Sequence, residues 1–453
     1  MRLSRFVTLA LVASLGCTRA TPPNVVIVSV DTLNRDALRA FAPAAPELPG
    51  FDALARASVR FSEALATASW TLPSHASLLT GLYPDRHGAT DRRLRLGEGV
   101  PTLAKELKRA GYETVAFTGG GYLDRRYGFA KGFERYEERI AGTGPVGPEA
   151  ASDSTGADDR LERGLAFLAT RQPHAVPLFL FLHSYAVHDY FRLHPATVER
   201  LPQRPVETPE ELTACLKAER RCPPETWAEL RRLYELEVAE FDTAVARLVD
   251  TLRARHLWDS TVLVLVSDHG EGFDPELGRT HHGGRLHGDV IRVPLLVRAP
   301  GIRPRTVDTP VSLVDVMPTL IDLLGVKRRP GLDGVSLAPL LRGGAPPPER
   351  PLFALEHAFL WTAGGRIEAP EVQAHPLAVT VIRGPDWYIR SATGEGLYDM
   401  ARDPRQRDNL ITRASPTELR ARADARSGLT APAAPVSVDA RLDDRLRALG
   451  YVR

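Results

Sequence analysis

Continuous apolar runs recur along the chain and are separated by polar or helix-like stretches. A short continuous apolar run, as opposed to an alternating one, is typical of a strand that is buried on both faces of a sheet. Five runs fit this description: Asn24–Val30, Glu113–Thr118, Pro177–Leu182, Thr261–Val266 and Val293–Val297. They predict a parallel sheet that is covered on both sides.

The intervals between these runs carry apolar residues at helical spacing. Helices are predicted over Pro101–Ala110, Trp227–Leu257 and Leu313–Leu324, the last of which ends at Gly325. Strands that alternate with helices predict an α/β fold, in which a large, mostly parallel sheet lies between helices.

The composition changes near Gly343–Pro351, where Gly and Pro cluster in the sequence GGAPPPERP. Beyond this segment the pattern is shorter and more polar. We therefore expect a principal domain over residues 22–342 and a small C-terminal α+β subdomain over residues 343–453. A chain of 453 residues is long enough for such a division.

The N-terminus has the three-part layout of a secretory signal. A basic segment, Met1–Arg5, precedes the apolar stretch Phe6–Gly16, and Cys17 follows. The apolar stretch is too short to span a bilayer as a helix. Because Leu15-Gly16-Cys17 resembles a bacterial lipoprotein cleavage site, we expect residues 1–17 to act as a signal peptide and Cys17 to carry a lipid anchor. The protein would then be an exported periplasmic or outer-membrane lipoprotein, with simple secretion as the alternative.

Charge and cysteine content narrow the function classes. The net charge of +2 arises from 58 basic and 56 acidic residues, whereas a dedicated nucleic-acid binder usually has a strong basic excess. No nucleic-acid partner is therefore expected. Cys215 and Cys222 can close a small disulfide loop in an oxidising compartment. No His or further Cys stands near them at metal-site spacing, so a zinc site is not expected there.

Acidic residues follow two of the predicted buried strands. Asp31 comes directly after Asn24–Val30, and Asp268 and His269 come just after Thr261–Val266. The carboxyl ends of parallel strands gather at one edge of a sheet, where ligands bind. Acids at such a place are costly unless they are hydrated, paired or bound to metal. Each alone could be a helix cap or a loop residue, but together they indicate metal ligands.

A short helix is predicted to begin near Thr71. Thr71 is a plausible N-cap, Pro73 fits a first helical turn, and Gly81 fits the helix end. A helix N-terminus favours negative charge, so it could stabilise a Thr alkoxide or an anionic ester. Taken by itself, this segment would be read only as a capped helix.

Several motifs together resemble one family. They are VDTLNRDAL, SWTLPSHASLLTGLYPDRHG, SDHGEGF, HGGRLHGDVIRVPLL, PVSLVDVMPTLIDLLG with DGVSLAPLL, and LYDMARDPRQRDNL. Their order and content are similar to the sulfatase family within the alkaline phosphatase superfamily, from Asn24 to about Leu410. The resemblance implies the fold of that family and a metal-dependent ester hydrolase.

By position, the resemblance implies that Asp31, Thr71, Asp268 and His269 hold one divalent metal ion and that Thr71 is also the nucleophile. Thr32 stands where the family often has an acid that completes a calcium site. Calcium prefers six to eight oxygen ligands, whereas imidazole suits zinc. We therefore expect zinc or manganese rather than calcium.

Three histidines receive roles from the same resemblance. His282 falls on the family's His-Gly pair, whose basic residue contacts the ester and can protonate the leaving group. His188 falls where the family often has a substrate-contacting His. His75 replaces the Arg that supports formylglycine, and we expect it to contact the substrate as well. The alternative for His188 and His282 is an ordinary loop histidine.

Departures from the family pattern bear on the chemistry. True sulfatases convert a Cys or Ser to formylglycine, but Thr71 carries an extra methyl group on Cβ and cannot yield that aldehyde. A hydrolase of sulfate or phosphate esters is expected, with Thr71 favouring phosphate mono- or diesters through a phospho-Thr intermediate. The substrate would be an anionic ester of a glycan, lipid or small molecule. The alternatives are an exported phosphotransferase and a catalytically silent lipoprotein that binds anionic glycans.

Overall fold

The computed structural model describes residues 22–138, 159–172, 176–192, 198–201, 207–216, 222–327, 329–362, 365–369, 371–428, 435–436, 443 and 446. The predicted signal peptide and Cys17 lie outside these residues. Within the described part of the chain, no helix combines the length and the apolar character that a membrane crossing requires.

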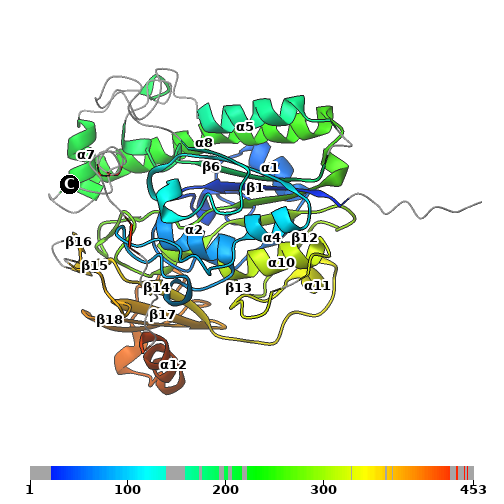
Figure 1. Cartoon of the computed structure of the whole chain (residues 1–453). Coiled ribbons are helices and arrows are strands. Elements are labelled where there is room, and N and C mark those ends of the chain that lie inside the picture. Colours follow the sequence, from blue (N-terminus) through cyan, green and yellow to red (C-terminus); the bar gives the residue numbers. More distant parts are fainter. Residues whose placement is uncertain are drawn as a thin grey trace, which may run out of the picture.

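An eight-stranded sheet forms the centre of the molecule, in the order β12-β2-β11-β7-β1-β6-β4-β5 (Figure 1). Its strands are β1 (Asn24–Val30), β2 (Val59–Phe61), β4 (Glu113–Thr118), β5 (Arg135–Glu138), β6 (Leu178–Ser184), β7 (Thr261–Val266), β11 (Leu295–Arg298) and β12 (Arg305–Val307). Strand β11 runs antiparallel to β2 and β7, whereas the other neighbours are parallel. The fold is therefore α/β with a mixed, mostly parallel sheet, as predicted.

Helices cover both faces of this sheet (Figure 1). One face packs against α1 (Pro49–Arg56), α5 (Asp159–Thr170) and α8 (Pro224–Ala254), and the other against α2 (Thr71–Thr80), α4 (Leu103–Arg109) and α10 (Val316–Leu323). Alternate residues of β1 enter different cores, with Val26 on the α8 side and Ile27 on the α2 side. Burial on both faces explains why the strand sequences are continuously apolar.

Most predicted strands match the observed ones, and one does not. Strands β1, β4 and β7 have the predicted bounds, and β6 extends to Ser184. The single strand predicted over Val293–Val297 is wrong, because β10 (Arg292–Val293) and β11 belong to different sheets. Pro294 lies between them and has no backbone N–H to continue a ladder of hydrogen bonds.

Smaller sheets and short helices complete the described fold. A three-stranded sheet has the order β10-β3-β13, in which β3 (Ala64–Leu65) pairs with both β10 and β13 (Val311–Ser312). Two hairpins are β8 (Phe273–Asp274) with β9 (Arg279–Thr280), and β15 (Phe359–Thr362) with β16 (Gly365–Glu368). The short helices are α3 (Pro84–His87), α7 (Pro209–Leu216), α9 (Gly288–Ile291) and α11 (Ala338–Leu341).

The C-terminal part forms an antiparallel sheet with a helix against it. Its strands follow the order β14 (Leu352–Glu356), β17 (Ala378–Arg383), β18 (Asp386–Ser391) and β19 (Gly394–Asp399), and α12 (Thr417–Ser427) packs on β17. One hydrophobic core contains Ala354 and Trp387 of this sheet together with Phe61 of the central sheet. The C-terminal sheet is therefore packed against the rest of the molecule, while a domain boundary near residue 343 stays a prediction.

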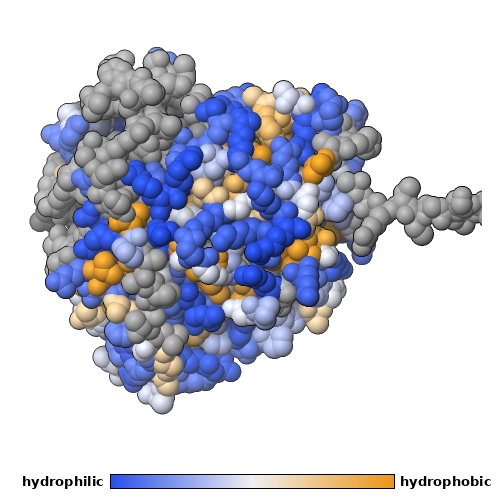
Figure 2. Space-filling view, in the orientation of Figure 1, coloured by the Kyte–Doolittle hydropathy of each residue, from blue (hydrophilic) through white to orange (hydrophobic). Residues whose placement is uncertain are grey.

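The predicted disulfide is present. Cys215, in the last turn of α7, is bonded to Cys222, which precedes α8. Such a bond persists in oxidising compartments, although the cellular location stays a prediction. The face shown in Figure 2 is mainly hydrophilic, with hydrophobic residues scattered over it.

Candidate active site

Two carboxylates and one imidazole lie where β1 and β7 end. These strands are neighbours and run parallel, with Ser29 opposite Val266, so the residues that follow them lie at the same edge of the sheet. Asp31, Asp268 and His269 are all fully buried there. Parallel strand ends gather polar groups in this way in α/β proteins.

Thr71 reaches the same point from the N-terminus of α2. The N-cap of this helix is Trp70, in extended conformation, and Thr71 is the first helical residue. The predicted N-cap role of Thr71 is therefore wrong by one position. Instead, its hydroxyl donates a hydrogen bond of 3.1 Å to Asp31 Oδ2 and lies 3.5 Å from His269 Nε2.

We call Asp31, Thr71, Asp268 and His269 the strand-end cluster. His269 Nε2 lies 3.3 Å from Asp268 Oδ2 and 3.7 Å from Asp31 Oδ1. One potential ligand atom from each of Asp31, Asp268 and His269 lies within 4.8 Å of the others. The structure thus brings together the four residues for which sequence analysis predicted a shared metal ion, while their roles stay predictions.

The chemistry of the strand-end cluster fits a cation. Asp31 Oδ1 and Asp268 Oδ1 are buried and accept no hydrogen bond from the described residues, a costly state for a carboxylate oxygen. Burial raises the pKa of Asp31 well above its ordinary value, and the charge of Asp268 raises it further. Burial also favours a higher pKa for Asp268, but His269 and His75 outweigh it and lower that pKa. A cation would compensate both carboxylates.

His75 supports the strand-end cluster from the next turn of α2. Its Nδ1 lies 3.2 Å from Asp268 Oδ2 and 3.0 Å from the carbonyl oxygen of Thr71, and its Nε2 lies 2.8 Å from Ser29 Oγ. Both ring nitrogens therefore contact protein atoms, and the ring is fully buried. Its predicted contact with substrate stays a prediction.

His183 also faces the strand-end cluster, although sequence analysis gave it no role. It lies near the end of β6, the other parallel neighbour of β1, with its Nε2 3.4 Å from Asp31 Oδ2. The backbone N–H of Gly119 donates a 3.3 Å hydrogen bond to its Nδ1. The rule that singled out Asp31 and Asp268, a polar residue at the end of a buried strand, also applies to His183.

His188 and His282 lie beside the strand-end cluster. The ring of His282 is 4.6 Å from that of His269 and 5.2 Å from that of His188, measured between centroids. His188 Nδ1 lies 2.8 Å from Asp189 Oδ1. The structure therefore places His282 next to His269 and His188 next to His282, while their contact with substrate stays a prediction.

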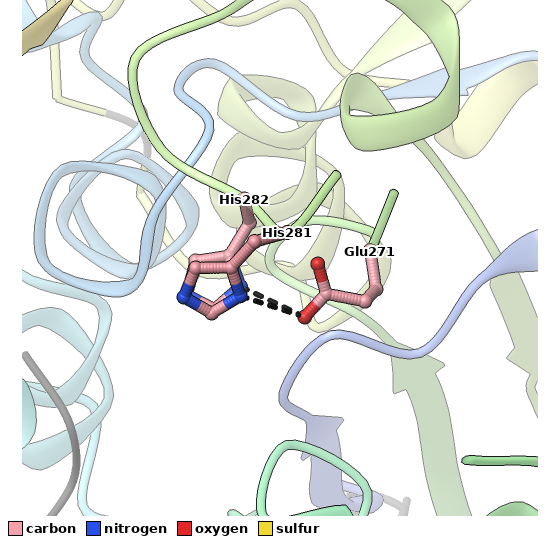
Figure 3. Close-up of side chains that lie close together, drawn as sticks. All are labelled: Glu271, His281 and His282. Atoms are coloured by element: carbon pink, nitrogen blue, oxygen red, sulfur yellow. Dashed lines mark hydrogen bonds and ion pairs between the residues drawn. The ribbon is translucent and has the colours of Figure 1, made fainter. Parts of the chain in front are cut away.

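A second group, which we call the loop cluster, consists of Glu271, His281 and His282 (Figure 3). Glu271 Oε2 lies 3.3 Å from His281 Nδ1 and 3.1 Å from His282 Nδ1. Burial lowers the pKa of His282 well below its ordinary value, and the charge of His281 lowers it further. Sequence analysis named only His282 of this group, because the family resemblance gave that residue a role and gave none to Glu271 or His281.

Glu356 connects both clusters to the C-terminal sheet. This buried carboxylate, at the end of β14, accepts hydrogen bonds from Ser69 Oγ (2.7 Å) and Trp70 Nε1 (3.1 Å), just before Thr71. It also accepts one of 3.3 Å from the backbone N–H of Gly284, two residues after His282. The segments on either side of the site are thus held by one side chain.

Comparison with known proteins identifies the family. Residues 23–326 match the sulfatase family. The chain is 27% identical to a choline-sulfatase of Rhizobium meliloti, over 86% of this chain and 82% of that protein. A putative sulfatase from Bacteroides thetaiotaomicron has a similar fold, with a TM-score of 0.71 at 21% identity over 93% of this chain and 96% of the other. The phosphonate monoester hydrolase of Agrobacterium radiobacter gives a TM-score of 0.69 at 21% identity, over 89% of this chain and 94% of that one. The chain therefore belongs to the sulfatase family, within the alkaline phosphatase superfamily, and is an ester hydrolase.

Proposed function

We propose that this enzyme hydrolyses phosphate mono- or diesters and that Thr71 is its covalent nucleophile. The observation that carries the proposal is the place of the Thr71 hydroxyl. It lies at the first residue of α2, donates to Asp31 Oδ2 at 3.1 Å, and is 3.5 Å from His269 Nε2. A helix N-terminus and a cation site at the same point both favour an alkoxide and an anionic ester.

The identity of the nucleophile favours phosphorus over sulfur. The sulfatase route depends on an aldehyde made from Cys or Ser, and oxidation of Thr71 would give a ketone instead. His75 stands where that route uses an Arg, and its ring nitrogens contact Asp268 and Ser29. A Thr alcohol can instead attack phosphorus and form an ester that water resolves.

We further propose that the strand-end cluster holds one divalent cation. When bound, such an ion would lower the pKa of the Thr71 hydroxyl and polarise the ester. Because His269 supplies nitrogen, zinc or manganese suits the site better than calcium. Elemental analysis of the purified chain should find zinc, manganese or iron; stoichiometric calcium without any of them would contradict this assignment.

Each proton transfer of the proposed reaction can be assigned to a group at the site. The hydrogen bond from Thr71 to Asp31 Oδ2 gives the hydroxyl proton an acceptor as Oγ1 bonds to phosphorus. The oxygen–phosphorus bond to the leaving alcohol then breaks. Water gives that oxygen a proton, while the ring of His282 donates a hydrogen bond to it. A second water hydrolyses the phospho-Thr ester. Burial lowers the pKa of His282 and so favours its neutral form, in which the ring nitrogen that carries the proton decides whether the ring donates or accepts a hydrogen bond.

The proposal is tested by substrate class and by trapping. Aryl sulfate, a phosphate monoester and a phosphate diester are offered to the metal-loaded enzyme, and we expect faster turnover of a phosphate ester. Rapid acid quenching followed by peptide mass spectrometry should locate a phosphoryl group on the peptide that contains Thr71. Turnover of aryl sulfate alone would contradict the proposal. An absence of turnover on all three would favour the silent binding protein, and transfer to added alcohols in preference to water would favour the phosphotransferase.

A further inference from the structure

We propose that the loop cluster is a second divalent-cation site, in which Glu271 Oε2, His281 Nδ1 and His282 Nδ1 are the protein ligands. These three atoms converge at the base of the β8–β9 hairpin, with Glu271 before β8 and both histidines after β9, and Figure 3 shows the three side chains together. The inference goes beyond the proposed function, because the three residues can bind an ion whether or not Thr71 attacks phosphorus. Only the catalytic consequence given below rests on that function.

The distances fit ligands that share one ion. Glu271 Oε2 lies 3.1 Å from His282 Nδ1 and 3.3 Å from His281 Nδ1. Two ligands that each lie about 2.1 Å from a tetrahedral ion are separated by roughly 3.4 Å. Two imidazole nitrogens and one glutamate oxygen are also a ligand set that holds catalytic zinc and leaves one position open.

The backbone of the loop is shaped to bring the three side chains together. His281 has a φ of 58°, in the left-handed region that side-chain-bearing residues rarely adopt. This conformation allows two consecutive imidazoles to face the same carboxylate, with ring centroids 4.0 Å apart. Strained conformations of this kind are typical of functional sites. Two histidines that faced solvent would not require a left-handed conformation at His281.

Backbone pairing fixes Glu271 opposite the two histidines. The N–H of His281 donates to the carbonyl of Gly272 at 3.0 Å, and the N–H of Gly272 donates to the carbonyl of His281 at 3.3 Å. Arg285 Nη2 donates to the same His281 carbonyl at 2.6 Å, and its Nη1 contacts Asp289 at 2.6 Å. The ligands are therefore held in place before any ion arrives.

All three ligands are buried beside the strand-end cluster. Glu271 and His282 are almost fully inaccessible, and His281 is 4% exposed. The ring of His282 is 4.6 Å from that of His269, so an ion in the loop cluster would neighbour the first one. Two adjacent divalent ions can stabilise both the attacking and the leaving oxygen of a phosphoryl transfer.

Cation binding at His282 Nδ1 would also settle the tautomer of that ring. A neutral imidazole with Nδ1 bound to an ion carries its proton on Nε2. His282 would then present an N–H donor on the side away from Glu271. This is the donor that the proposed leaving-group role needs, and without the ion the carboxylate of Glu271 would instead hold the proton on Nδ1.

Metal stoichiometry tests the site without reference to turnover. The tag-free chain is stripped with a chelator, loaded with Zn²⁺, desalted and analysed for zinc per chain. We expect two equivalents in the wild type. Glu271→Ala and His281→Ala should each retain one equivalent, and Asp268→Asn should lose the other while keeping that of the loop cluster.

His287→Gln serves as the matched control, because His287 is half-buried in the segment that follows His282 but is not among the three ligands; it should keep two equivalents. His281→Gln preserves side-chain size should the alanine variant fold poorly. A single equivalent in the wild type would overturn the proposal, as would two equivalents in both Glu271→Ala and His281→Ala. Neither result would bear on Thr71, whose role is judged by phosphoryl trapping.

Discussion

The strand-end cluster and the loop cluster use the same chemistry but are built in different ways. The first assembles residues as far apart as Asp31 and Asp268, which meet because β1 and β7 are parallel neighbours. The second takes all its residues from Glu271–His282 and relies on one left-handed residue and one backbone pair. A site fixed by sheet topology tolerates local change, whereas a site fixed by loop conformation does not.

The largest loss of activity should come from substitution of the nucleophile, which belongs only to the strand-end cluster. Thr71→Ala should lower kcat by roughly 10⁴-fold or more, as removal of a nucleophile does in other enzymes that form covalent intermediates. Thr71→Ser, which removes only a methyl group, should retain much of the activity. Phosphate-ester turnover of both variants is the measurement. An alanine variant as active as the wild type would show that the nucleophile lies elsewhere.

A matched pair of carboxylate variants compares the clusters directly. Asp268→Asn should lose the first cation and lower kcat/KM by about 10³-fold, since removing one group that stabilises transition-state charge costs about this much. Glu271→Gln should cost only about 10- to 100-fold, the range seen when groups that support a metal centre are changed. Steady-state kinetics with metal analysis decides the order. Equal losses would mean that the clusters do not differ in this way.

A change of backbone should affect the loop cluster selectively. In Gly272→Ala the new Cβ would lie 2.7 Å from the carbonyl oxygen of Arg279 and 2.9 Å from that of His281, so the loop must shift. We expect a stability loss of about 1–3 kcal/mol and loss of one of two zinc equivalents. Calorimetry and metal analysis are the measurements.

Gly99→Ala is the control for that variant, because nothing lies within 4 Å of a Cβ at Gly99. It should match the wild type in both melting temperature and zinc content. Retention of two zinc equivalents by Gly272→Ala would argue that the loop cluster does not depend on its backbone conformation.

The smallest effect on turnover is expected for a buried histidine outside both clusters, whose contribution is to stability in acid. Burial lowers the pKa of His87 to about 3, while its ring contacts the carbonyl of Pro73 and the hydroxyl of Ser77. In the unfolded chain His87 therefore binds a proton as the pH falls below about 6.5, whereas in the folded chain it stays unprotonated until the pH falls to about 3. Stability should fall as the pH drops from about 6.5 towards 3, with His87 contributing about 1.4 kcal/mol per pH unit.

Denaturant unfolding of His87→Gln and wild type between pH 7 and 4 measures this contribution. The unfolding free energy of the variant should change less steeply with pH than that of the wild type, by an amount equivalent to about one bound proton. An unchanged slope would show that His87 is protonated in the folded chain.

The sequence predicted what depends on burial and topology and missed what depends on loop conformation. Strands β1, β4 and β7 were recognisable because burial on both faces demands unbroken apolar runs. The break between β10 and β11 at Pro294 can be recognised only when the hydrogen-bonding partners of each strand are known, and a run of apolar residues does not reveal them.

The same distinction applies to the candidate site. Asp31 and Asp268 could be found because polar residues directly follow buried strands, and His183 could have been found by the same rule. Glu271 and His281 could not, because they come together only through the positive φ of His281 and the pairing of Gly272. Neither feature leaves a periodic trace in the sequence.

The hydrogen bonds of Glu356 limit how this protein can be recombined. Its carboxylate holds Ser69 and Trp70 on one side and Gly284 on the other. A chimera that grafts another relative's C-terminal region onto residues 22–342 must bring an acceptor to this position, or the donors before Thr71 and after His282 would be stranded in the interior. The C-terminal region is therefore part of the structural support of the site and cannot be exchanged as an independent module.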